Sequence, residues 1–148
     1  MPDDHEAIDD MFLVFTMEEQ NYAVEIHYVT EIIEMMPITN VPNLPSCLKG
    51  IINLRGSVIP VMDVRLRFGL METDYTERTC IIVVDNEGMM LGLIVDAVQE
   101  CMTIDEEKRM PPPSTNVGGN ARYIKGVSRN GNSIQLLLDC DKLMDLMG

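Results

Sequence analysis

Tryptophan is absent from this 148-residue chain, and aromatic residues of all kinds make up only 5% of it. Positive charge is also scarce, because 11 Lys and Arg stand against 24 Asp and Glu, a formal net charge of −13. Proteins that bind single-stranded nucleic acids combine a basic groove with exposed aromatic rings. The composition therefore argues against general nucleic-acid binding, and the negative field argues against binding to anionic membranes.

Clustered metal ligands are missing too. The four cysteines are 33, 21 and 39 residues apart, form no C-x-x-C pair, and are accompanied by only two histidines. This spacing argues against a zinc site and against a disulfide framework. We expect buried free thiols, no metal and no cofactor; the cysteines are Cys47, Cys80, Cys101 and Cys140.

No apolar run approaches the roughly 20 residues that a membrane-spanning helix needs. Residues 1–10 form an acidic lead-in that lacks the basic and apolar parts of a signal peptide. The rest of the chain has the length and the apolar content, 46%, of one compact domain. We therefore expect a cytoplasmic protein with a single domain at residues 11–148.

Catalytic signatures are absent as well. The sequence contains no nucleophile elbow, no Walker A motif and no dinucleotide-binding glycine motif. A hydrolase would have to combine Ser46 or Ser57 with His27, and no third catalytic group is recognisable near His27. On a helix, His27 and Glu31 would be spaced as a surface pair. We predict that the protein is not an enzyme.

What the chain does contain is a series of short apolar segments typical of strands. Residues 11–15 and 22–26 predict a β-hairpin around a polar turn. The spacing of apolar residues over 28–33 then predicts a short helix.

Strands are also expected at residues 50–54 and 58–64, joined by a tight turn at Arg55-Gly56. Pro60 has no N–H to donate, so the second of these strands should be an edge strand or carry a bulge. Asp63 is placed to cap a short helix that follows.

The order of these segments recurs. Shifts of 69 and then 76 residues align the first half of the chain with the second, and we interpret this as two homologous β units at about 11–68 and 79–139. Each is small, so we expect a common core. A C-terminal helix is expected at 140–147, a turn at Asn130-Gly131 and an exposed loop at 114–120. The aligned pairs include Val14 with Val83, Glu31 with Glu100, Gly50 with Gly126 and Asp63 with Asp139.

One segment departs from the acidic composition. Residues 49–67 carry four cations, Lys49, Arg55, Arg65 and Arg67, against the single acid Asp63. A turn arginine is commonly just solvated. An alternative function follows from this segment, that of a small β-barrel that binds an oligonucleotide through the basic patch, although Phe68 is the only aromatic residue beside it.

The same segment resembles the signature of the CheW-type chemotaxis coupling proteins. The longest similar run is LKGIINLRGSVIPVMDVR at residues 48–65. The resemblance begins near Phe12 and continues through GLIVD at 92–96 and YIKGV at 123–127, so that it covers nearly the whole chain after the lead-in. It implies a mainly β fold of two intertwined, pseudo-symmetric, five-stranded SH3-like β-barrels with short helices.

The resemblance also implies a function. CheW-type proteins are non-enzymatic scaffolds that couple chemoreceptors to the histidine kinase CheA in chemotaxis signalling. The implied partners are the regulatory domain of CheA and the cytoplasmic tips of methyl-accepting chemoreceptors, so the protein would be recruited to membrane-associated receptor arrays. Opposite charges further predict that Glu31 and Arg55 face each other. The partner-binding residues that the resemblance implies are Val29, Glu31, Gly50, Asn53, Arg55 and Gly56.

Overall fold

The computed structural model describes residues 10–112 and 121–146. The acidic lead-in up to residue 9, the expected loop at 114–120 and the last residue of the expected C-terminal helix lie outside the described residues. Within the described ranges the chain forms eleven strands and several short helices.

The elements follow the predicted order of strands. In the first half they are β1 (Met11–Met17), β2 (Gln20–Glu25), the 3-10 helix η1 (Ile26–Tyr28), β3 (Val29–Glu34), β4 (Leu48–Leu54), β5 (Ser57–Asp63) and the helix α2 (Val64–Arg67). In the second half they are β6 (Cys80–Asn86), β7 (Met89–Val95), β8 (Ala97–Thr103), η2 (Glu106–Lys108), β9 (Arg109–Met110), η3 (Ala121–Tyr123), β10 (Ile124–Asn130), β11 (Ser133–Leu138) and α3 (Cys140–Met144).

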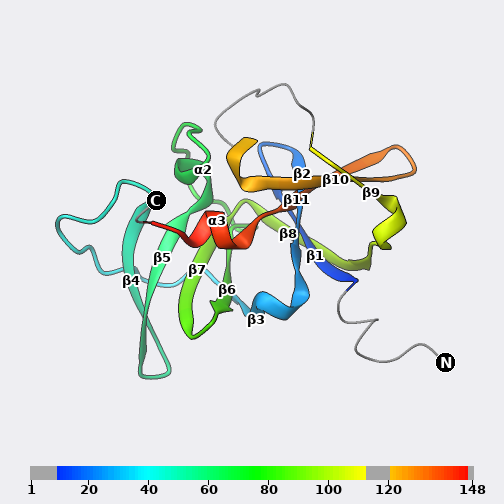
Figure 1. Cartoon of the computed structure of the whole chain (residues 1–148). Coiled ribbons are helices and arrows are strands. Elements are labelled where there is room, and N and C mark those ends of the chain that lie inside the picture. The colour runs from blue at the N-terminus through cyan, green and yellow to red at the C-terminus, as the bar shows by residue number, and fades with distance from the viewer. Residues whose placement is uncertain (1–9, 113–120, 147–148) are drawn as a thin grey trace.

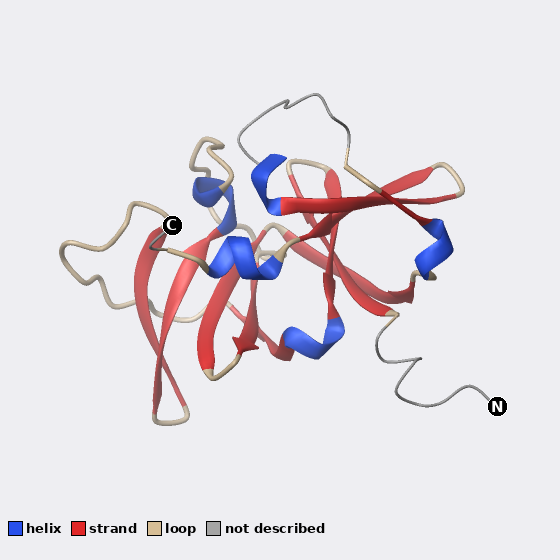
Figure 2. Ribbon diagram, in the orientation of Figure 1, coloured by secondary structure: helices blue, strands red, loops and turns tan. Residues whose placement is uncertain are grey.

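The strands form two sheets, and each sheet takes strands from both halves of the chain (Figures 1 and 2). Sheet A has the order β8-β1-β2-β11-β10-β9, and sheet B has the order β3-β6-β7-β5-β4. When β1 to β5 are matched in turn with β6, β7, β8, β10 and β11, the two orders become identical apart from the short extra strand β9. The halves are therefore interwoven, which confirms the predicted mainly β, pseudo-symmetric fold.

Irregularities in the ladders repeat at matching positions. The register of β4 against β5 shifts between Leu48 and Gly50. The register of β10 against β11 shifts between Ile124 and Gly126, which are the same positions 76 residues later. Because a bulge changes the local twist and is set by particular residues, its repetition supports a duplicated unit.

The strands β1 and β6 are buried on both faces, and this explains their unbroken apolar sequences. One face of each strand lines the interior of its own sheet, and the other face joins a large cluster shared by the two sheets. Each side chain of this size contributes about 1.5–3 kcal/mol when fully buried. The shared cluster takes Leu13, Phe15, Ile82 and Val84, the sheet A interior takes Phe12 and Val14, and the sheet B interior takes Ile81 and Val83.

The helix expected over residues 28–33 is wrong. Only the 3-10 turn η1 forms, and residues 29–34 are strand β3, antiparallel to β6. Val29, Glu31 and Ile33 are half-buried, while the positions between them are exposed. A two-residue period therefore describes the segment, and β6 supplies backbone partners along it. The expected His27–Glu31 pair is also wrong, since His27 Nδ1 lies 3.9 Å from a Glu25 oxygen.

Two expectations about hairpins need correction. Strand β5 lies between β7 and β4 rather than at an edge. Its pairing with β7 begins only at Val61, so at Pro60 the strand has a partner on one side alone, and a missing N–H is tolerated there. The second-half turn lies at Gly131-Asn132, one residue later than expected, because Asn130 still pairs with Ser133.

All four cysteines are free, as expected, but they are not all buried. Cys47 and Cys140 are buried and Cys80 is half-buried, whereas Cys101 is exposed on β8, where the expectation was wrong. Burial, and after it the nearby charge of Asp141, raises the pKa of the Cys140 thiol to about 12. That thiol is therefore protonated at neutral pH and unreactive.

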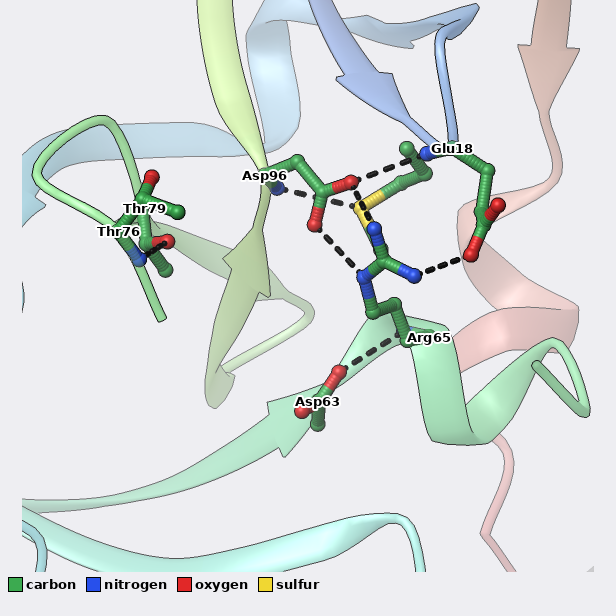
Figure 3. A network of polar contacts seen from close by, with 7 residues as sticks. Glu18, Asp63, Arg65, Thr76, Thr79 and Asp96 are labelled. Atoms are coloured by element: carbon green, nitrogen blue, oxygen red, sulfur yellow. Dashed lines mark hydrogen bonds and ion pairs between the residues drawn. The ribbon is translucent and has the colours of Figure 1, made fainter. Parts of the chain in front are cut away.

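A network of ion pairs joins the two sheets (Figure 3). Arg65 in α2 donates from Nε to Asp96 Oδ1 at 2.9 Å and from Nη2 to Asp96 Oδ2 at 2.6 Å. Asp96 is the single residue between β7 of sheet B and β8 of sheet A. Arg65 also pairs with Glu18 in the β1–β2 turn, whose N–H donates to Asp96 at 3.0 Å. The buried carboxylate of Asp63 caps α2 by accepting the Arg65 N–H at 2.9 Å.

We predict that Gly50→Ala lowers the free energy of unfolding by about 3 kcal/mol, because it adds a steric clash to a strained backbone. Gly50 has φ +148°, and a Cβ there would lie 2.1 Å from the Thr39 carbonyl oxygen. Gly126→Ala is the control, since its Cβ would lie 3.1 Å from the Met110 carbonyl oxygen. Urea denaturation should show a clearly smaller loss for Gly126→Ala, and equal losses would contradict this account.

We also predict that Arg65→Met lowers the free energy of unfolding by about 2 kcal/mol, because it leaves the carboxylates of Asp96 and Glu18 facing each other without a cation. The Arg65 side chain is only 12% exposed. Arg55→Met is the matched control, because it breaks an exposed pair worth about 0–1 kcal/mol. If both variants unfold at the same urea concentration, the network does not join the sheets as described.

Candidate functional site

The turn between β4 and β5 places Arg55 at the tip of a hairpin. Arg55 and Gly56 have φ values of +51° and +88°, as in the type I′ turns that match the twist of two-residue hairpins. Asn53 holds the turn, because its Oδ1 accepts the Gly56 N–H at 2.9 Å. Left-handed φ is uncommon for a residue with a side chain. The sequence therefore keeps a charged group where a smaller residue would fit the backbone better.

Arg55 reaches across to sheet-edge strand β3, where its Nη2 pairs with Glu31 Oε2. The expected approach of these two charges is therefore confirmed, although Glu31 lies on a strand and not on a helix. The Arg55 side chain remains 68% exposed and that of Glu31 is 31% exposed. Strands β3 and β4 are the two edges of sheet B, so this pair bridges its opposite edges.

A register shift in β3 orients Glu31. Val29 pairs with Val84, but Glu31 pairs with Val83, so one residue of β3 is extra at this point. Thr30 fills the irregularity, because its Oγ1 donates to the Val83 carbonyl oxygen at 3.1 Å. Val29 is half-buried and packs against the shared cluster.

Gly50 differs from the other predicted site residues because it is buried. It lies at the register shift of β4, with its Cα against the backbone of Thr39. Thr39 and Ile51 form an isolated bridge through hydrogen bonds of 2.8 and 2.9 Å. Gly50 thus lets the segment before β4 lie directly on the hairpin, beneath the surface that carries Arg55.

The structure brings together four of the six predicted residues at the exposed end of sheet B. Glu31 pairs with Arg55, and Asn53 binds Gly56 in the turn. Val29 and Gly50 stand behind this surface and set the backbone of the strands that carry it.

The basic segment does not form an open cationic patch. Lys49 pairs with Glu72, Arg65 with Asp96, and Arg67 donates to the main-chain oxygens of three residues near the C-terminal end of the described chain. The neighbouring ring of Phe68 is 1% exposed and cannot stack on a base. The oligonucleotide-binding alternative is therefore not favoured.

The hydrolase alternative also lacks a site in the part of the chain that the structure describes. Ser46 and Ser57 are exposed, and no hydrogen bond joins either of them to His27 there. Residues 10–112 and 121–146 contain no group of three potential metal ligands, and none of their helices is long and apolar enough to cross a membrane.

Sequence reasoning missed Val58, which is the most exposed apolar residue of this hairpin at 64%. Its pairing with Asn53 puts both on the outward face beside the turn. The signal was present, because Asn53 and Val58 are symmetrically placed about Arg55-Gly56, and residues so placed in a two-residue hairpin lie opposite each other.

Comparison with known proteins agrees with this geometry. The CheW-like domain model matches residues 11–147. The chain is 31% identical over 139 residues to the chemotaxis protein CheW of Klebsiella aerogenes, covering 94% of this chain and 84% of that protein. It is 28% identical over 131 residues to the protein FrzA of Myxococcus xanthus, covering 85% and 80%.

A solved structure is similar throughout. The crystal structure of the scaffolding protein TtCheW from Thermoanaerobacter tengcongensis matches with a TM-score of 0.85 and 34% sequence identity, covering 95% of each chain. Its two-sheet architecture is thus shared along nearly the full length of both proteins. Together with the family match, these similarities show that the chain belongs to the CheW family of chemotaxis scaffold proteins.

Proposed function

We propose that this protein is a non-enzymatic scaffold that couples chemoreceptors to the histidine kinase CheA. The observation that carries the proposal is the exposed Glu31–Arg55 pair at the open end of sheet B. A surface ion pair adds little to stability. Its charges are more useful for orienting a protein partner, since complementary charges set the register of an interface.

The six residues would contribute in different ways. Arg55, Glu31 and Asn53 would contact the partner, because they carry accessible polar groups on one surface. Gly56 permits the turn, while Val29 and Gly50 support the strands from behind. Arginine is enriched among residues that dominate binding energy, so Arg55 should be the principal one.

The partners we propose are the regulatory domain of CheA and the cytoplasmic tips of methyl-accepting chemoreceptors. Binding to both would recruit a cytoplasmic protein to receptor arrays at the membrane. The similarity to proteins named for chemotaxis and for scaffolding supports this assignment. The net charge of −13 makes direct attachment to anionic lipid a poorer explanation.

We predict that Arg55→Ala weakens binding to CheA or to receptor-containing membranes about thirtyfold, which corresponds to a loss of about 2 kcal/mol from an interface residue. The free energy of unfolding should change by less than about 0.5 kcal/mol, because the side chain is largely exposed. Co-sedimentation with purified CheA and receptor membranes, together with a melting curve of each variant, measures both quantities.

Arg129→Ala is the matched control, since Arg129 is an exposed arginine of the corresponding hairpin in sheet A. It should leave binding unchanged. If wild-type protein does not co-sediment with either partner, the proposed function is wrong. If Arg55→Ala binds both partners normally, the function stands but Arg55 does not belong to the site.

A further inference from the structure

The two parallel ladders of the fold do not extend equally far. In sheet A, β11 pairs with β2 over residues 135–137. In sheet B, β5 pairs with β7 over residues 61–63. With the 76-residue shift, residue 135 corresponds to residue 59, so the sheet B ladder stops two residues farther from the hairpin tips. The β4–β5 hairpin extends away from sheet B towards its turn (Figure 1).

Pro60 explains the earlier separation. Pairs in an antiparallel hairpin alternate between hydrogen-bonded and non-bonded, and the pair that closes a two-residue turn is bonded. Leu54 and Ser57 close this turn, so the backbone groups of Val58 and Pro60 point away from β4. The counterpart of Pro60 in sheet A is Leu136, which has an N–H and pairs with β2. Pro60 has none to offer to β7.

The result is an unpaired backbone segment beside Arg55. The N–H and C=O of Val58 point away from β4 and lie outside the ladder with β7. The side chain of Val58 is 64% exposed, and Met89, which the register of β5 and β7 would place opposite, is 49% exposed. In sheet A the same position is bridged, because Asn21 Nδ2 donates to Ser133 Oγ at 3.3 Å.

We propose that Val58 pairs through its backbone with an extended segment of the partner protein. The segment would add to the edge of β5, exchanging two hydrogen bonds with the N–H and C=O of Val58. It would place an apolar side chain against Val58 and Met89. This inference rests on the proposed function, because it describes how the surface around Arg55 engages its partner.

Charge defines the segment further. Arg55 carries five N–H donors, and its contact with Glu31 uses Nη2 alone. The remaining donors face solvent on a side chain that is 68% exposed. A carboxylate in the partner segment would complete a charge-assisted contact with them. The partner chemistry is therefore an extended strand with an apolar residue and an acid near it.

Amide hydrogen exchange tests this pairing directly. In the free protein the Val58 amide should exchange rapidly, because it has no ladder partner. In the complex with CheA or with receptor membranes it should slow at least about tenfold, roughly what one strong backbone bond provides. The complex in which it slows identifies which partner supplies the strand. Unchanged exchange in both complexes overturns the proposal.

A pair of variants separates the backbone from the side chain. Val58→Pro removes the outward N–H while sparing the bonds to β4, and Val58→Ala keeps that N–H. We expect Val58→Pro to bind at least about fivefold more weakly than Val58→Ala, as loss of a hydrogen bond worth about 1 kcal/mol requires. Ile134→Pro is the matched control, because Ile134 occupies the corresponding position in sheet A, 48% exposed and opposite Arg129.

The outcomes separate the two proposals. If wild-type protein binds its partners but Val58→Pro and Val58→Ala bind equally well, the pairing is wrong and the scaffold function stands. If Ile134→Pro weakens binding as much as Val58→Pro, the effect is a general disturbance of hairpins and the pairing is again wrong. If the wild-type protein binds neither partner, the proposed function fails and this inference fails with it.

Discussion

The burial of β1 and β6 on both faces is the constraint on which the rest of the structure depends. Each strand divides its side chains between the interior of one sheet and the cluster that both sheets share. A shift by one residue would exchange these two sets, so the register of both strands is strongly specified. The neighbouring strands β3 and β8 inherit that register, and β3 in turn fixes the place of Glu31.

Scarce cations are used for structure at most positions of the basic segment. Arg65 ties the crossover between the sheets to the first hairpin, and Arg67 holds main-chain oxygens next to α3. Arg55 is different, because its partner lies on the same exposed surface and most of its side chain remains accessible. An acidic protein thus presents a defined positive group at one end of sheet B.

Much of the fold could be predicted from the sequence, because the repeated order of apolar runs and turns reflects a repeated arrangement of strands. The approach of Glu31 to Arg55 could be predicted as well, from charge and resemblance. The strand at residues 29–34 could not, since its apolar residues fit a helical spacing equally well and only pairing with β6 decides between the two. The exposed state of Cys101 depends on its place in an edge strand, which composition does not reveal. The free backbone of Val58 follows from comparing two ladders, and neither ladder can be seen in the sequence alone.

The exchange of strands between the halves also governs how the chain acquires its structure. When the first 70 residues have left the ribosome, β1 and β2 still lack β8 and β11, and β3 to β5 lack β6 and β7. The parallel pairs join segments far apart in the chain, including Val61 with Gly92 and Leu137 with Ala23. Such non-local contacts slow folding, because the entropy of closing a long loop is lost before the contact forms. Sheet A can be completed only when β11 has been synthesised, so the nascent chain must wait with its apolar strands unpaired, a period in which association with other chains competes with folding.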